Sequence, residues 1–282
     1  MKMQLIAASR FHLCAWLICM LFVGHAISGE ASDSGGNADK ARALPELETA
    51  LHGSPALLDI HGQKLADGDF SQWLEGQHLQ VKITYDFGSE RRIEEQATFM
   101  EQPALTQEKW SWRELRNGQV ERQFKVDFAA RKADAEKRDG QEMKKWSEEI
   151  KVEPGRTFAG FGFTLAIKAA CEQLLKHHKV ELQAVAFTPK PRIVPVEISY
   201  GGLNEMTMGA RNMRGELFLI HPKVPSIAKV FVNVEDTKIW LTTPRPNSFL
   251  RWEGQLVEPN DPRVRVDLLS GKESGPAKPV SE

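Results

Sequence analysis

HLQVKITYDF, residues 78–87, alternates strictly between apolar and polar side chains. A period of two places every second side chain on the same face of an extended strand. The stretch therefore predicts a β-strand with one buried face and one exposed face. The buried face consists of Leu79, Val81, Ile83, Tyr85 and Phe87.

The same period continues in the segments that follow. Trp110 and Trp112 stand two positions apart among charged neighbours. Further along, Phe124 and Val126 share one face, which Arg122 interrupts with a charge. These segments predict further strands of the same half-buried kind.

The segment 131–152 is highly charged and carries Asp139-Gly140 near its middle. Asp-Gly between two extended segments is a strong hairpin signal. A charged helix over residues 133–145 is the alternative. We favour the hairpin because the period of two resumes at Trp146 and continues to Val152.

Residues 161–179 (FGFTLAIKAACEQLLKHHK) are rich in helix formers and predict the one long helix of the chain. The final HHK suits the negative end of the helix dipole. Glycines and aromatic residues alternate just before the helix and in its first turn. We interpret this segment as a hinge, and the alternative is a gate in which Phe161 and Phe163 cover a hydrophobic cavity. The glycines are Gly155, Gly160 and Gly162.

Short strand-like segments return after the helix, separated by prolines. They are residues 180–187, 193–200, 206–208, 217–220, 228–234, 238–242, 249–256 and 264–269. Pro195 interrupts one of them and predicts an edge strand or a bulge. The whole pattern predicts a mainly β fold. We expect a curved antiparallel sheet, either a half-barrel or a β-sandwich, with one long helix packed on it.

The N-terminal segment has the form of a secretory signal peptide. Lys2 and Arg10 precede an apolar run over 11–23, and small residues follow at Ala26 and Ser28. That run is shorter than the roughly 20 apolar residues that a transmembrane helix needs. We therefore expect a periplasmic protein without a transmembrane anchor after cleavage, with an extracellular location as the alternative. The expected parts are a signal peptide at 1–28, a flexible polar leader at 29–43, a single β-rich domain at 44–270 and a disordered tail at 271–282.

The net charge bears on binding to nucleic acid and lipid, and the cysteine content bears on disulfide formation. Cleavage after residue 28 removes two of 37 basic residues and none of 38 acidic ones, which leaves 35 and a net charge of about −3. This near-balance argues against a nucleic-acid binder and gives no reason to expect attraction to anionic lipid. Cys14 and Cys19 lie in the signal, so Cys171 alone remains and no intrachain disulfide forms.

Ser226-Ile227-Ala228-Lys229 matches Ser-x-x-Lys, the nucleophile motif of penicillin-recognising enzymes. In those enzymes the serine begins a buried helix, whereas the Val-Phe-Val that follows here favours a strand. Neither Lys-Thr-Gly nor Lys-Ser-Gly follows later in the chain. We therefore expect a turn serine here and assign no catalytic residue.

The histidines and the remaining cysteine are weak candidates for chemistry. His177 and His178 are adjacent, so on a helix they point about 100° apart and do not share a metal readily. His221 can act as a third metal ligand only if the fold brings it close to His177 and His178. We expect no metal site and no cofactor. Cys171 has small and apolar neighbours, which predicts a buried thiol rather than a nucleophile.

Five tryptophans lie on predicted strands, where each either belongs to the core or lines an apolar ligand cavity. They are Trp110, Trp112, Trp146, Trp240 and Trp252. Trp110 and Trp112, together with Phe161 and Phe163, are the residues that we expect to contact a ligand.

The combination of signal, disulfide-free chain, long sheet and single helix is similar to periplasmic half-barrel proteins. These include the lipoprotein carriers of the outer-membrane sorting pathway and strand-rich families of unknown function. Residues 236–241 and 249–254 look like the last strands of such a sheet. The resemblance covers about 76–268 as a pattern and implies a concave sheet face that holds an acyl chain. It carries over no site residue.

We therefore predict an exported, non-enzymatic protein that binds a hydrophobic ligand, such as a lipid or acyl chain, or a lipid-modified partner. One alternative is an envelope-assembly or structural protein that acts through its surface, with strand addition to an edge such as the Pro195 segment. Another is a hydrolase that uses the Ser226–Lys229 motif or a histidine-based site.

Overall fold

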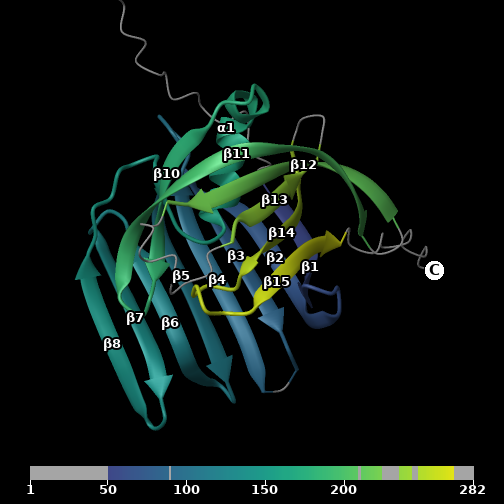
Figure 1. The fold of residues 1–282 in the computed structure, drawn as a ribbon. Helices are drawn as coiled ribbons and strands as arrows, with labels where there is room; N and C mark the ends of the chain where they lie inside the picture. Colours follow the sequence, from purple (N-terminus) through teal and green to yellow (C-terminus); the bar gives the residue numbers. More distant parts are fainter. Residues whose placement is uncertain (1–49, 89, 209–210, 224–234, 243–246, 270–282) are drawn as a thin grey trace, which may run out of the picture. The chain divides into compact units, whose positions relative to one another are not determined.

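The structure is a computed structural model, and it describes residues 50–88, 90–208, 211–223, 235–242 and 247–269. These residues form one large, curved, open sheet of fifteen strands and a single helix (Figure 1). The prediction of a mainly β fold with a curved antiparallel sheet and one helix is confirmed.

The elements follow one another closely along the chain. Their bounds are β1 (Ala50–Asp59), β2 (Lys64–Glu75), β3 (His78–Asp86), β4 (Arg91–Met100), β5 (Thr106–Arg116), β6 (Gln119–Asp127), β7 (Lys132–Asp139), β8 (Glu142–Glu149), β9 (Thr157–Phe158), α1 (Gly162–Leu175), β10 (Val180–Phe187), β11 (Pro191–Met208), β12 (Arg211–Pro222), β13 (Thr237–Leu241), β14 (Phe249–Gln255) and β15 (Arg263–Leu269).

The sheet consists of two meanders joined along a single pair of strands. Strands β1 to β8 pair in sequence order, strands β9 to β15 do the same, and β15 returns to pair with β1. All pairs are antiparallel except β9 with β10. Within the described residues, β8 and β9 are the two edges of the sheet. Two meanders of the same sheet thus face each other through its curvature.

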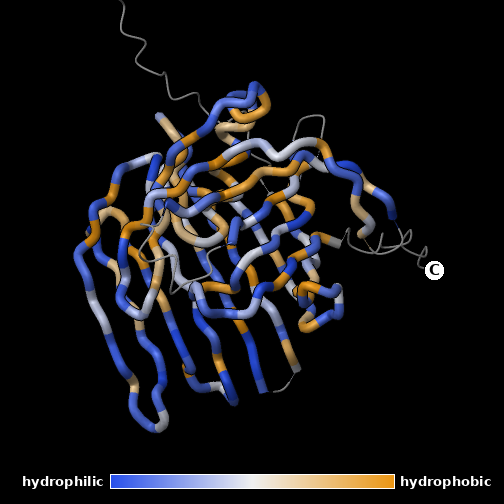
Figure 2. Tube along the Cα trace, in the orientation of Figure 1, coloured by the Kyte–Doolittle hydropathy of each residue, from blue (hydrophilic) through white to orange (hydrophobic). Residues whose placement is uncertain are grey.

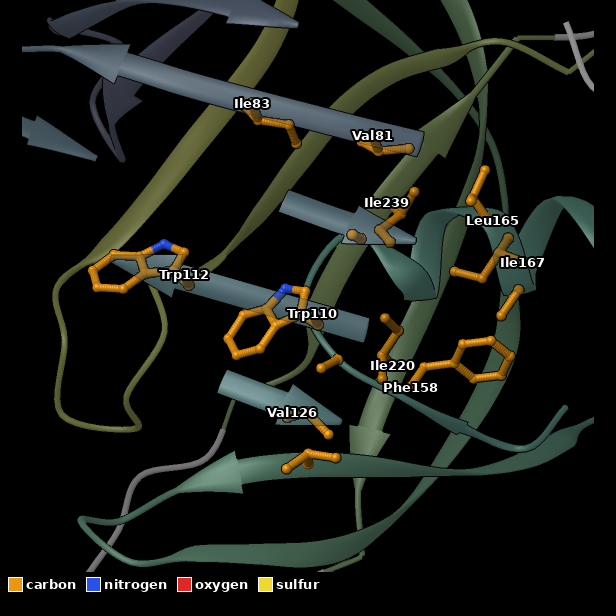
Figure 3. Close-up of a cluster of buried hydrophobic side chains, with 14 of the residues drawn as sticks. Val81, Ile83, Trp110, Trp112, Val126, Phe158, Leu165, Ile167, Ile220 and Ile239 are labelled. Carbon is orange, nitrogen blue, oxygen red and sulfur yellow. The ribbon is translucent and has the colours of Figure 1, made fainter. Parts of the chain in front are cut away.

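The hydrophobic core lies between the inner faces of these two meanders. Strand β3 alternates as expected, with buried side chains at Leu79, Val81, Ile83 and Tyr85. Figure 2 shows apolar and polar residues alternating along several other strands, whereas the β7–β8 hairpin is mostly hydrophilic. In Figure 3, side chains of β3 and β5 face residues of α1, β12 and β13 across the core. The helix therefore packs against the inner faces of both meanders.

The charged segment after β6 forms the predicted hairpin, not a helix. Strands β7 and β8 pair from Lys132–Glu149 to Asp139–Glu142, which leaves a two-residue turn. Gly140 occupies the first turn position with a φ of +64°, as a type II′ turn requires. The Asp-Gly signal therefore located the turn correctly.

The helix is shorter than predicted and ends at Leu175 rather than at residue 179. His177 has a φ of +61°. Its N–H donates to the Leu174 carbonyl, and the N–H of His178 donates to the Gln173 carbonyl. These two bonds form a Schellman motif, which satisfies the last carbonyls and terminates the helix. Histidine here takes the position that glycine usually fills.

Two strand expectations need correction. Pro195 lies on β11, where it pairs with Gln183 of β10 on one side. On the other side its carbonyl accepts the Lys223 N–H at 2.8 Å, so it is not at an edge. The register shift of that strand lies at Tyr200–Gly202 instead. Residues 50–75 form β1 and β2, which the sequence analysis did not assign. Their signal is weak because Gly68 and Gln72 occupy inward positions of β2.

Candidate binding site

A cavity of about 300 Å³ lies between the inner faces of the two meanders and the start of α1. Its wall is mostly apolar and comes from both halves of the sheet. The four residues predicted to contact a ligand all line it: Trp110, Trp112, Phe161 and Phe163. A volume of this size falls at the lower end of the range for small-molecule sites.

The two tryptophans share the cavity wall because they stand two positions apart on β5 (Figure 3). They are 4% and 3% exposed. Trp110 stacks on Phe187 of β10 with ring centroids 5.7 Å apart, and Trp112 contacts Phe124 of β6 at the same separation. This packing fixes both indoles, so the wall is rigid at this place.

Phe161 is the residue just before α1, Phe163 lies in the first turn of the helix, and both are half-buried. The Phe161 ring lies 5.3 Å from that of Phe70 and 6.4 Å from that of Phe249. Phe163 lies 6.1 Å from Phe158. Phe161 thus touches side chains of both meanders at the cavity, as a residue that closes it would.

A carboxyl group lies in this mostly apolar wall, at a position that was not among the predicted site residues. Glu95 stands on β4 between the buried Ile93 and Ala97, on the inner face of the strand. Its Oε1 accepts hydrogen bonds from the Trp110 indole N–H at 2.8 Å and from the Phe161 backbone N–H at 2.7 Å. A carboxyl at the start of α1 also suits the positive end of the helix dipole.

Burial raises the pKa of Glu95 above its usual value, although the two N–H donors act in the opposite direction. Burial also raises the pKa of Tyr85, and the nearby Glu95 adds to that effect. Both groups therefore favour their neutral forms, as expected for polar groups in a poorly solvated wall.

The segment 159–161 is held in place by two side chains of the first meander. The Ala159 N–H donates to Gln107 Oε1 at 2.7 Å, and Gln107 Nε2 donates back to the Ala159 carbonyl at 3.1 Å. Glu95 holds the neighbouring Phe161 N–H. The expected hinge is thus clamped onto β4 and β5 rather than free, and it fixes the position of Phe161.

Glu95→Gln is expected to change how stability depends on pH. Because the folded-state pKa of Glu95 is raised, its protonation stabilises the folded state fully below about pH 4.5, and this contribution is lost as pH rises through the folded pKa. Glutamine keeps the acceptor for Trp110 and Phe161 but cannot ionise. Chemical denaturation between pH 4 and 8 should therefore show the variant gaining stability relative to the wild type as pH rises.

The exposed Glu142→Gln is the control for a simple change of net charge. A difference between Glu95→Gln and wild type that stays constant over this pH range, or that shrinks as pH rises, would contradict the poorly solvated environment of the Glu95 carboxyl.

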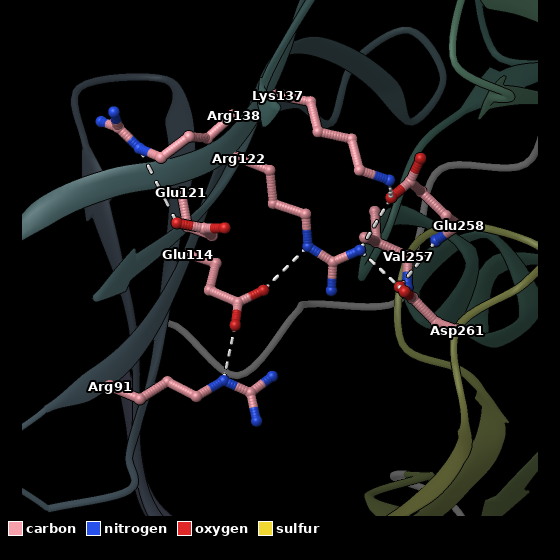
Figure 4. Close-up of polar contacts among 9 residues, drawn as sticks. All are labelled: Arg91, Glu114, Glu121, Arg122, Lys137, Arg138, Val257, Glu258 and Asp261. Carbon is pink, nitrogen blue, oxygen red and sulfur yellow. Dashed lines mark hydrogen bonds and ion pairs between the residues drawn. The ribbon is translucent and has the colours of Figure 1, made fainter. Parts of the chain in front are cut away.

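A buried ion network supports another part of the wall, the turn between β14 and β15 (Figure 4). Arg122 Nε donates to Glu114 at 2.8 Å, and its Nη1 donates to Glu258 at 2.8 Å and to Asp261 at 2.7 Å. The guanidinium carbon also lies 5.0 Å from the centroid of the Trp112 ring. The turn residues 256–259 line the cavity, so Arg122 joins the turn to the tryptophan wall.

Burial works against the charge of Arg122, but the hydrogen bonds and charges of Asp261 and Glu114 outweigh it and raise the pKa of Arg122. Asp261 in turn accepts the backbone N–H groups of Val257 and Glu258. The turn therefore has its own internal support as well as its bond to Arg122.

Among the described residues, the histidine and cysteine candidates do not line the cavity. Ser226–Lys229 falls outside the described residues. His221 Nδ1 lies 2.7 Å from Asp236 Oδ1, and the ring of His177 lies 5.4 Å from that of Tyr200. Cys171 is fully buried, as predicted. Within the described part of the chain, no cluster of three or more His, Cys, Asp or Glu side chains has the geometry to hold a metal ion.

The remaining strand tryptophans divide between core and cavity. Trp240 is buried in a small second cluster, and Trp146 packs at the edge of the main core. Trp252 on β14 also lines the cavity. Among the described residues, no helix is both long and apolar enough to cross a membrane.

Comparisons with known proteins found no matching family model, no matching curated protein and no matching solved structure. The likeness to the lipoprotein carriers therefore rests on the pattern of the sequence alone.

Proposed function

We propose that this chain is an exported, non-enzymatic protein that binds an apolar ligand in the cavity between the two meanders. A lipid, or the acyl chain of a lipid-modified partner, is the class of ligand that fits such a wall. The observation that carries the proposal is the convergence of Trp110, Trp112, Phe161 and Phe163 on one apolar cavity.

The energetics of such binding follow from the apolar wall. Each methylene group moved from water into an apolar site contributes about 0.8 kcal/mol. About eight buried methylenes therefore supply roughly 6 kcal/mol before the cost of association is subtracted. An acyl chain thus reaches useful affinity without any polar contact, provided that the cavity stays open.

The sequence supports the location of this activity. The N-terminal segment has the form of an export signal. A lipid or lipid-modified protein that crosses an aqueous compartment needs its chains shielded from water, because their exposure is unfavourable. A cavity with a mostly apolar wall provides that shield.

Ile83→Trp is expected to abolish ligand binding by filling the cavity. Ile83 lies on β3 between Phe70 and Glu95 on the neighbouring strands, and all three line the cavity. Its side chain is 6% exposed and belongs to the buried face of β3. We expect at least about a tenfold loss of affinity for dodecanoate, measured by intrinsic tryptophan fluorescence, because the added ring displaces several buried methylenes.

The matched control is Thr84→Trp, one residue along the same strand and on its opposite face. It adds a tryptophan of similar fluorescence without entering the cavity. Equal affinity of both variants and the wild type for dodecanoate would refute the cavity as the binding site.

The alternative of a protein that acts through its surface assumed strand addition at an exposed edge near Pro195. Pro195 lies on a strand that is hydrogen-bonded on both sides. Of the two edges in the described residues, β9 is only two residues long. Strand β8 carries charges at most positions, a feature that discourages strand addition. The cavity therefore remains the better-supported site.

A further inference from the structure

Two polar side chains stand together in the mostly apolar wall of the cavity. Tyr85 of β3 pairs with Ile93 of β4, and Glu95 lies two residues further along the same strand. Paired residues of adjacent strands share a face, and diagonal neighbours lie within reach of long side chains. Both Tyr85 and Glu95 line the cavity.

Both groups have hydrogen-bonding capacity that no described residue of the protein satisfies. Both hydrogen bonds that reach the Glu95 carboxyl converge on Oε1, and within the described residues Oε2 receives none. Tyr85 is only 7% exposed, and no described residue makes a hydrogen bond with its hydroxyl. Because Tyr85 lines the cavity, its hydroxyl is accessible from that side and can bond a group placed there. Glu95 Oε2 and the Tyr85 hydroxyl can therefore both form hydrogen bonds with a polar group of a ligand in the cavity.

We propose that Tyr85 and Glu95 form a subsite for the hydroxyl group of an uncharged, long-chain alcohol. The ligand class is thus an apolar chain that ends in, or carries, a hydroxyl. This inference rests on the proposed function, because it names the polar end of the ligand in the same cavity.

A hydroxyl fits this pair better than an anionic group does. It both donates and accepts, so it matches Tyr85 and the Glu95 carboxyl in either protonation state. A carboxylate ligand would place a second acid beside Glu95 where solvent is scarce, which disfavours ionisation of both. Lys168 also lines the cavity, but it is engaged in an interaction of its own.

The test compares 1-dodecanol with dodecanoate at pH 7.5, both below their solubility limits, by tryptophan fluorescence. The wild type should bind 1-dodecanol at least about tenfold more tightly than dodecanoate. Tyr85→Phe should weaken 1-dodecanol binding by about 2- to 12-fold, the range of one hydrogen bond. It should leave dodecanoate binding and the thermal midpoint unchanged, because the hydroxyl has no partner within the described chain.

The chain offers one matched control. Its only other tyrosine is Tyr200, whose hydroxyl donates to Glu216 outside the cavity. Tyr200→Phe should leave the affinity for both ligands unchanged.

The outcomes separate the two proposals. Equal affinity of the wild type for 1-dodecanol and dodecanoate, or no effect of Tyr85→Phe on 1-dodecanol, would overturn the hydroxyl subsite and leave the cavity as the binding site. Failure of both ligands to bind would overturn the proposed function, and the subsite with it.

Discussion

Arg122→Met is expected to lower the free energy of unfolding by about 3–5 kcal/mol, the cost of removing one partner from a buried ion network. The Arg122 side chain is 11% exposed, and it contacts carboxylates of β5 and of the turn after β14. Methionine keeps much of the length of the side chain but none of its charge. The loss therefore reports the charge of the network rather than a cavity.

The size of this effect depends on which partners the three carboxylates retain in Arg122→Met. Glu114 retains Arg91, and Glu258 retains Lys137. Among the described residues, Asp261 then retains only its two backbone donors. The negative charges of these three buried or nearly buried acids are thus only partly compensated, which is unfavourable. The turn after β14 also loses its bonds to Arg122 of the first meander.

Equilibrium denaturation in urea measures this loss, and Arg113→Met is the matched control. Arg113 pairs with Glu94, but its side chain is 47% exposed. An ion pair with this exposure contributes about 0–1 kcal/mol. Similar losses for the two variants would show that the Arg122 network is not buried as described.

Gly160→Ala is the second change with a large expected effect. Gly160 has a φ of +51°, where a side chain is strained. An added Cβ would lie 2.1 Å from Glu95 Oε1 and 2.3 Å from the Trp110 indole nitrogen. We expect a loss of about 2–4 kcal/mol in stability, the sum of backbone strain and of the shift forced on packed neighbours.

Gly76→Ala isolates the backbone contribution in the same experiment. Gly76 has a φ of +64°, and a Cβ there would meet nothing within 4 Å. It should lose only about 1–2 kcal/mol, the cost of the left-handed conformation. Equal losses at both positions would mean that Gly160 is not pressed against Glu95 and Trp110.

The parts of this structure that could be predicted are those that local pattern controls. The alternation at 78–87 and the Asp139-Gly140 turn led to β3 and to the β7–β8 hairpin, because strands and tight turns depend on neighbouring residues. Trp110 and Trp112 could be placed on one face for the same reason. Phe161 and Phe163 were suggested only by their place at the start of the helix, and ligand contact by the four aromatic residues stays a prediction.

The parts that escaped prediction depend on residues far apart in the chain. Arg122 was visible as a charge on an apolar face, but its partner Glu258 lies 136 residues away. Glu95 carried a usable signal as well, since it interrupts an inward row between Ile93 and Ala97. No local pattern indicated that β15 would pair with β1.

The length of the helix was overestimated for a different reason. Residues 176–179 favour a helix by composition, but His177 adopts a left-handed conformation that ends it. The Schellman bonds of this terminus outweigh the small differences in helix propensity.

Native mass spectrometry of residues 29–282, purified after export, tests the central claim most directly. The wild type is expected to carry a lipid or a long-chain alcohol of defined mass, which organic solvent extracts. Thr84→Trp should retain that ligand, and Ile83→Trp should be empty. An empty wild type, or an equal load in Ile83→Trp, would contradict the account that the cavity between the two meanders binds an apolar ligand.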